Sequence, residues 1–183
     1  VIARPGASSR RGETESVARA LSAYRRVVPI REPGTLDGGD VLVAGHTAFV
    51  GRSTRTNEAG IEQLRRAVSP LGYTVVPIPV TGCLHLKSAV TEVADGVLVF
   101  QPDWVAADFF RGFEAIAVAA GELYGANALR IGDRVIYPAG FPKTAERLAE
   151  RLANRAVSLR LVEADELAKA EGAVTCCSLV FDA

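Results

Sequence analysis

The sequence predicts an α/β fold assembled from repeated strand–turn–strand–helix–strand units. Short apolar runs alternate with amphipathic segments, and pairs of apolar runs are joined by turns that contain glycine. The same order recurs every ~45 residues, a period typical of propellers and other repeat architectures. No low-complexity linker or charge block divides the 183 residues, so we predict a single domain that spans residues 1–183.

The first repeat follows a short β-branched run at residues 27–30, which we expect to be a strand. Residues 41–44 and 47–51 then form a predicted hairpin around a glycine-containing turn. A helix is expected to start near Thr56, because apolar side chains recur from there at helical spacing. A strand at residues 73–80 completes this repeat.

The second repeat predicts strands at residues 84–93 and 97–100, with Asp95-Gly96 as a strong hairpin signal between them. Residues 106–121 carry apolar side chains around most of a helical circumference, which predicts a buried helix.

The third repeat shows the same order in its apolar runs. Residues 127–131 and 135–137 are predicted strands on either side of Gly132. A helix is expected to open at Pro142, because proline is favoured in the first turn of a helix. A strand at residues 157–162 follows.

Composition and charge exclude several classes of protein. The chain is 49% hydrophobic and 23% charged, which excludes a disordered protein. The 21 Lys and Arg residues balance 21 Asp and Glu residues, so neither nucleic acid nor an acidic membrane surface is an expected partner. No apolar run approaches the roughly 18 residues of a membrane-spanning helix. Three cysteines make no disulfide framework and suit a reducing compartment, so we expect a cytoplasmic protein.

The N-terminus lacks a starting methionine, and the chain contains no Met at all. Its first residues already read as the middle of a strand. We therefore expect a fragment, a processed chain or further residues before Val1, with the N-terminal repeat missing or incomplete.

Asp37 is the first candidate catalytic residue. It lies in a glycine-rich turn, residues 34–40, directly before an apolar strand, so its carboxylate can face a pocket. The alternative is that Asp37 and Asp40 only make hydrogen bonds within the turn.

His85 is the second candidate. It alternates with Leu84 and Leu86, so on a strand it would face away from their core side. Histidine is the side chain most easily poised for proton transfer near neutral pH. The alternative is a structural histidine. His46, the other histidine, lies in a predicted turn and is expected to be solvated.

Cys176 is the third candidate. Glycine-containing residues 171–175 lead into a predicted terminal strand, where Leu179 and Phe181 would share the core face with Cys177. Cys176 would then be the accessible thiol. The alternative is that both cysteines are small buried hydrophobes. An acid, a histidine and a cysteine from three strand ends would form a nucleophile–base–orienter set.

Metal and phosphate sites are not indicated. No two candidate ligands have the spacing typical of zinc sites, and no phosphate-binding glycine motif occurs.

Taken together, these segments resemble the dimethylarginine dimethylaminohydrolase family of the guanidine-modifying pentein superfamily. The resemblance covers essentially the whole chain. The matching segments are residues 4–7 with 10–11, 35–42, 50–51 with 55–57, 84–88, 138–142 and 172–179.

The resemblance implies a pentein-type α/β propeller of ββαβ units around a substrate channel. It places the nucleophile on Cys176, the general acid and base on His85, and the acidic partner on Asp37. The remaining implied contacts are to the substrate: side chains at Arg55 and Arg10 hold the α-carboxylate, and backbone near Ala170 adds a contact.

The chemistry implied by the resemblance is hydrolysis of an Nω-methylated arginine to citrulline and methylamine or dimethylamine. It passes through a covalent thiouronium intermediate and requires no cofactor or metal. The family's acidic guanidinium-binding loop lies upstream of Arg4, outside this sequence, which leaves a non-catalytic pentein-like binding module as an alternative.

An arginine deiminase is a further alternative, although that family has aspartate where this chain has Lys87. A homodimer is one way to cover strand edges that an incomplete ring would expose, and the sequence leaves the oligomeric state open.

Overall fold

A computed structural model describes residues 1–180. The chain divides into two compact units. Unit 1 comprises Val1–Val80 with Leu84–Leu86, and unit 2 comprises Thr81–Cys83 and the chain from Lys87 onward. The single domain expected from the sequence remains a prediction.

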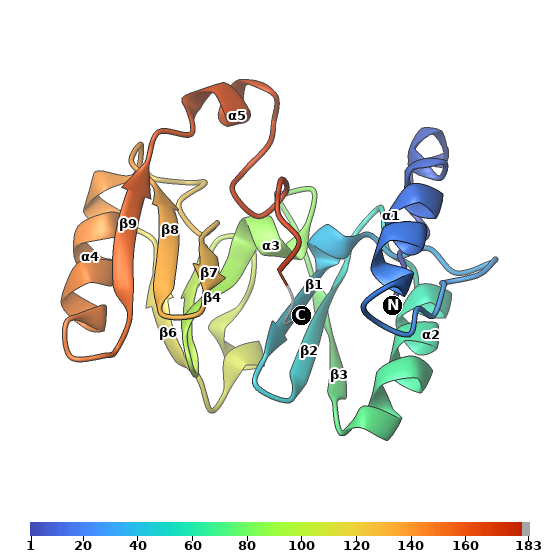
Figure 1. Ribbon diagram of the computed structural model, residues 1–183. Coiled ribbons are helices and arrows are strands. Elements are labelled where there is room, and N and C mark those ends of the chain that lie inside the picture. Colours follow the sequence, from blue (N-terminus) through green and yellow to red (C-terminus); the bar gives the residue numbers. More distant parts are fainter. Residues whose placement is uncertain (181–183) are drawn as a thin grey trace. The chain divides into compact units, whose positions relative to one another are not determined.

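Unit 1 contains one three-stranded sheet and two α-helices (Figure 1). Its elements are η1 Ser8–Arg10, α1 Glu13–Ser22, η2 Gly38–Asp40, β1 Val41–Ala44, β2 Thr47–Arg52, α2 Glu58–Val68, η3 Ser69–Leu71 and β3 Thr74–Pro79. The predicted hairpin, helix and strand of the first repeat are confirmed.

Helix α2 begins where the sequence predicts because Asn57 caps it. The Asn57 side chain accepts a hydrogen bond from the Gly60 N–H at 2.9 Å, which satisfies one of the unpaired donors of the first turn. Ile61 and Leu64 then face the sheet and pack in the core of unit 1.

Residues 27–30 form no strand, contrary to the sequence prediction. Only an isolated parallel bridge joins Pro29 to Ile2. Pro29 has no N–H to offer a ladder, which limits the pairing of this short run.

Unit 2 contains two three-stranded sheets. Its elements are α3 Leu86–Ala89, which begins at the last residue of unit 1, β4 Val90–Ala94, β5 Val97–Phe100, η4 Ala107–Phe110, β6 Glu114–Ala117, β7 Leu129–Ile131, β8 Arg134–Pro138, α4 Pro142–Leu152, β9 Ser158–Val162 and α5 Asp165–Lys169. The two sheets share one core, to which α4 contributes Leu148 and Leu152. The third predicted repeat is confirmed.

All three sheets have the same topology. In each, the first two strands form an antiparallel hairpin and the third strand lies parallel to the second. Gly96 in the middle hairpin has φ +70°, a left-handed conformation that glycine adopts without a steric cost. The hairpin and the parallel third strand of the predicted repeat are thus present three times, and an α-helix precedes the third strand in the first and the last of them.

The connection between β5 and β6 is not the long helix expected at residues 106–121. A single 3-10 turn, η4, is followed by Gly112 at φ +94°, and the chain then enters β6. Apolar side chains on all sides suit a buried strand as well as a buried helix, so the pattern alone does not distinguish them.

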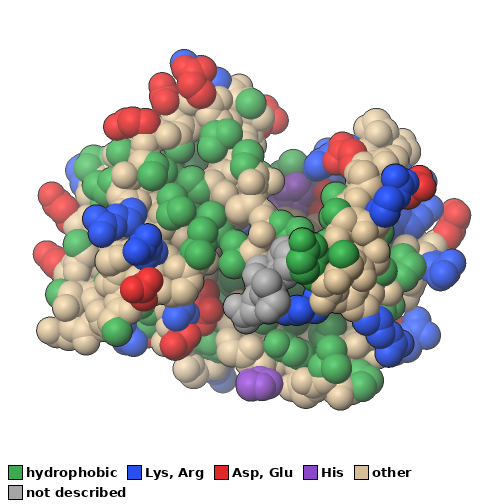
Figure 2. Space-filling view, viewed as in Figure 1, with side chains coloured by type: hydrophobic (Ala, Val, Ile, Leu, Met, Phe, Trp, Pro, Cys, Tyr) green, Lys and Arg blue, Asp and Glu red, His purple; other side chains and the backbone are tan. Residues whose placement is uncertain are grey.

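The surface carries both signs of charge. Figure 2 shows basic and acidic side chains interspersed over the visible face, in keeping with 21 residues of each kind. Within residues 1–180, no helix combines the length and the apolar character needed to cross a bilayer.

Candidate active site

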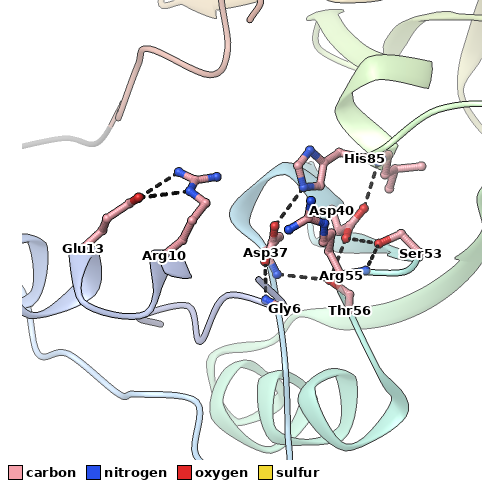
Figure 3. A network of polar contacts seen from close by, with 10 residues as sticks. Gly6, Arg10, Glu13, Asp37, Asp40, Ser53, Arg55, Thr56 and His85 are labelled. Atoms are coloured by element: carbon pink, nitrogen blue, oxygen red, sulfur yellow. Dashed lines mark hydrogen bonds and ion pairs between the residues drawn. The ribbon is translucent and has the colours of Figure 1, made fainter. Parts of the chain in front are cut away.

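A buried carboxylate, Asp37, forms the centre of a polar network in unit 1 (Figure 3). Its Oδ2 lies 2.9 Å from Nε2 of His85, and its Oδ1 accepts a hydrogen bond from the Gly6 N–H at 2.9 Å. Its own N–H donates to Thr56 Oγ1 at 3.1 Å. The structure therefore brings together two of the three residues that the sequence singled out.

The environment of Asp37 favours its charged form. Burial raises the pKa of this carboxyl, but the hydrogen bonds from His85 and the Gly6 N–H and the positive charges of His85 and Arg55 lower it. The net result is a pKa below the ordinary value of 3.8. Asp37 is thus a carboxylate at neutral pH, suited to orient His85 and to stabilise its protonated form.

Asp40 supports this network through three hydrogen bonds of its own. It is fully buried, and it accepts hydrogen bonds from Ser53 Oγ and Thr56 Oγ1, both at 2.6 Å, and from the Leu86 N–H at 3.0 Å. Asp40 therefore links the strand end that carries Thr56 to the segment that carries His85. No hydrogen bond from the Asp37 side chain caps η2, so Asp37 and Asp40 do more than stabilise their own turn.

His85 does not lie on a strand, contrary to the sequence prediction. It immediately precedes the short helix α3. Leu84 is 48% exposed whereas Leu86 is fully buried, so these two leucines do not share a core face. His85 therefore reaches Asp37 from the residue that precedes α3, and not from a strand.

The imidazole ring of His85 packs closely against Gly39. A Cβ added at Gly39 would lie 2.7 Å from His85 Cγ and 2.9 Å from its Nδ1, closer than real Cβ atoms approach their neighbours. Only a residue without a side chain leaves room for the ring in this position.

We expect Gly39→Ala to displace the His85 ring and to lower turnover more than stability. Forcing a methyl group into a packed site costs typically about 1–3 kcal/mol, which the ring can relieve by moving away from Asp37. Turnover and thermal unfolding of Gly39→Ala and Gly38→Ala should be compared, since nothing lies within 4 Å of a Cβ at Gly38. Equal turnover in the two variants would contradict this prediction.

The two arginines that the resemblance assigns to the substrate differ in their surroundings. Arg55 is half-buried, and Figure 3 shows its side chain beside Asp37 and His85. Arg10 is exposed and pairs with Glu13, with its Nη2 2.9 Å from Oε2. Both roles in substrate binding remain predictions.

The segment that carries Cys176 lies in unit 2 and is not a strand in its described part. Residues 174–177 form turns, and both Cys176 and Cys177 are exposed. The expectation that Cys177 and Leu179 face the core is wrong, since Leu179 is 63% exposed. Phe181 lies outside the described residues.

Ala170 lies at the C-terminal end of α5, and its N–H donates to the Leu167 carbonyl at 3.1 Å. Because Cys176 and Ala170 belong to unit 2, their pairing with His85 and with substrate stays a prediction. Among residues 1–180 no group of three or more His, Cys, Asp or Glu side chains is arranged to hold a metal ion.

Comparison with known proteins shows the family. The chain is 46% identical over 182 residues to N(G),N(G)-dimethylarginine dimethylaminohydrolase of Streptomyces coelicolor, covering 98% of this chain and 67% of the relative. It is 34% identical over 183 residues to the enzyme of the same name from Pseudomonas aeruginosa, covering 99% of this chain and 70% of that protein. The chain belongs to the dimethylarginine dimethylaminohydrolase family.

The fold agrees with this assignment. A solved structure of the Pseudomonas aeruginosa dimethylarginine dimethylaminohydrolase, a cysteine-to-serine variant complexed with citrulline, superposes with a TM-score of 0.89 at 34% identity. The superposition covers 97% of this chain and 69% of that one. No protein-family model matches the chain. The three repeated sheets are those of the pentein fold, and the family predicted from the sequence is confirmed.

Sequence reasoning missed several residues that support the site. The sequence indicates only a turn-forming role for Asp40, and it gives no signal for Ser53. Their hydrogen bonds join parts of the chain that lie 13 and 46 residues apart, so no local pattern signals them.

Proposed function

We propose that the protein hydrolyses Nω-methylated arginine to citrulline and a methylamine. Membership of the dimethylarginine dimethylaminohydrolase family supports this proposal, as does the citrulline held by the Pseudomonas aeruginosa relative. The observation within this chain that carries it is the contact of 2.9 Å between Asp37 and His85. A buried carboxylate on an imidazole is the arrangement that proton-transfer catalysis uses.

In the proposed first step, the Cys176 thiolate attacks the central carbon of the guanidinium group. A C–S bond forms, and His85 donates a proton to the methylated nitrogen. The C–N bond then breaks and releases methylamine or dimethylamine. The product on the enzyme is a thiouronium group, and covalent catalysis of this kind divides one difficult displacement into two easier steps.

In the proposed second step, His85 takes a proton from water, which attacks the same carbon. The C–S bond breaks, citrulline leaves and the thiolate is restored. The second proton of the water passes to solvent, which balances the proton that the released amine takes up there. Asp37 accepts from the Nε2–H of His85, which fixes the tautomer and assigns the proton transfers to Nδ1.

The proposal is tested by following product release from dimethylarginine, monomethylarginine and arginine in parallel. We expect citrulline together with dimethylamine or methylamine from the two methylated substrates, and little ammonia from arginine. Ammonia release from arginine at a higher kcat/KM would instead indicate a deiminase. Absence of any product, with all three substrates, would favour a binding module.

A further inference from the structure

The segment that carries Cys176, residues 173–180, has short-range hydrogen bonds within itself. The Cys176 N–H donates to the Ala173 carbonyl at 2.9 Å, and the Ser178 N–H donates to the Thr175 carbonyl at 3.4 Å. The Ser178 hydroxyl donates to the Val174 and Thr175 carbonyls at 3.2 and 3.1 Å. These are turn bonds within the segment. They shape the turn locally but do not fix it to the rest of the protein.

Asn127 supplies the hydrogen bonds that fix this segment. Its Oδ1 accepts from the Thr175 N–H at 3.2 Å, and its Nδ2 donates to Thr175 Oγ1 at 2.8 Å and to the Lys87 carbonyl at 2.9 Å. Asn127 thus joins residues 173–180 to the remainder of unit 2 by two hydrogen bonds to Thr175, one to its N–H and one to its hydroxyl.

The hydrogen-bonding partners of Asn127 determine how its amide is oriented and which residue type can make these three bonds. The Lys87 carbonyl can only accept and the Thr175 N–H can only donate, so the amide cannot be reversed. The three bonds require two donors and one acceptor on a short side chain. Aspartate lacks the donors, and a hydrophobic residue lacks all three groups.

The backbone around Asn127 is itself held rigidly. Asn127 is 5% exposed, and its neighbours Ala126 and Ala128 are buried. The Thr91 hydroxyl on β4 donates to the Ala126 carbonyl at 2.7 Å and accepts from the Ala128 N–H at 3.0 Å. Asn127 therefore projects from a backbone segment that is anchored to β4.

From this arrangement we infer that Asn127 is a positioning residue for Cys176. It fixes Thr175, the residue directly before the nucleophile, by a side-chain bond and a backbone bond, and so sets where the thiol stands. The inference rests on the proposed function, in which Cys176 attacks the substrate. Displacement of a reacting atom by about 1 Å can cost on the order of 10²-fold in rate.

The test compares four variants of the protein with the unaltered protein. Asn127→Ala removes all three bonds, Thr175→Val removes only the hydroxyl bond, and Thr175→Ser keeps it. Gln101→Ala is the matched control, since Gln101 is also a buried amide of unit 2 with two hydrogen bonds, to Leu123 and Asp103. The measurements are kcat, KM, thermal unfolding and amide hydrogen exchange of residues 174–178.

We expect Asn127→Ala to lower kcat by about 10²-fold with little change in KM. Amide exchange of residues 174–178 should rise about tenfold, since loss of ordinary hydrogen bonds shifts a local opening by that factor. Thr175→Val should show a smaller loss in kcat that Thr175→Ser restores. Gln101→Ala should affect thermal unfolding without affecting kcat or this exchange.

Unchanged exchange of residues 174–178 in both Asn127→Ala and Thr175→Val would overturn the inference. So would increased exchange with an unchanged kcat. If the unaltered protein forms no citrulline, the proposed function fails, but the exchange comparison still decides whether Asn127 fixes this segment. If Asn127→Ala does not fold, the comparison of Thr175→Val with Thr175→Ser decides the question, because these variants leave Asn127 unchanged.

Discussion

Cys176→Ser is expected to lower turnover of dimethylarginine by on the order of 10⁴-fold or more, the scale of nucleophile losses in hydrolases. A serine hydroxyl ionises far less readily than a thiol near neutral pH, so it attacks the guanidinium carbon poorly. Cys176 is exposed in a turn, and serine has nearly the same size, so the fold should be retained. Steady-state release of citrulline, with thermal unfolding as a check on folding, measures this effect.

Cys177→Ser provides the matched control. Cys177 is the next residue, is equally exposed and carries the same chemical group, yet Asn127 holds the residue before Cys176 and not the one before Cys177. We expect Cys177→Ser to retain turnover within a few fold. Full activity in Cys176→Ser, or loss of activity only in Cys177→Ser, would rule out Cys176 as the nucleophile.

The sequence predicted those elements whose ends carry strong local signals. Asn57 supplies a side-chain oxygen at the start of α2, Asp95-Gly96 allows the tight turn between β4 and β5, and Pro142 suits the first turn of α4. Each of these signals acts within a few residues. The repeat was visible for the same reason, because it is a repetition of local patterns.

The elements that the sequence misassigned lack such signals or depend on distant contacts. Residues 114–117 become β6 because they pair in parallel with β5, and an apolar run alone does not reveal that partner. The alternation around His85 favoured a strand, but the Asp40 carboxylate binds the Leu86 N–H, and α3 begins at that residue.

The residues of the candidate site also differ in how well the sequence predicts them. The sequence indicates Asp37 as a reactive side chain in a glycine-rich turn and His85 as one between two leucines. Their contact of 2.9 Å, however, cannot be derived from the order of the residues in the chain. Asp40, Gly39 and Asn127 were not recognised as supports, since each acts on a residue far away in the sequence. Reactive groups are therefore easier to find from sequence than the residues that hold them.

His85→Gln is expected to lower turnover by roughly 10³-fold, because a positioned general acid or base contributes about 10²–10⁴-fold. Glutamine can still donate a hydrogen bond to Asp37, but it cannot carry a proton between the leaving amine and water. The variant thus removes the proton chemistry while leaving a partner for the buried carboxylate. His46→Gln is the matched control, since His46 is exposed in the hairpin turn and stacks on Tyr73.

The dependence of this loss on the leaving group distinguishes acid catalysis from a structural effect. A substrate analogue with a thiolate leaving group in place of the amine needs no proton when that group leaves. The His85→Gln variant should therefore lose much less of its first-step rate with this analogue than with dimethylarginine. A merely structural role of His85 would slow both substrates equally. Comparison of the single-turnover rates for dimethylarginine and the thiolate analogue, in the His85→Gln and His46→Gln variants, therefore tests whether the imidazole beside Asp37 delivers the proton.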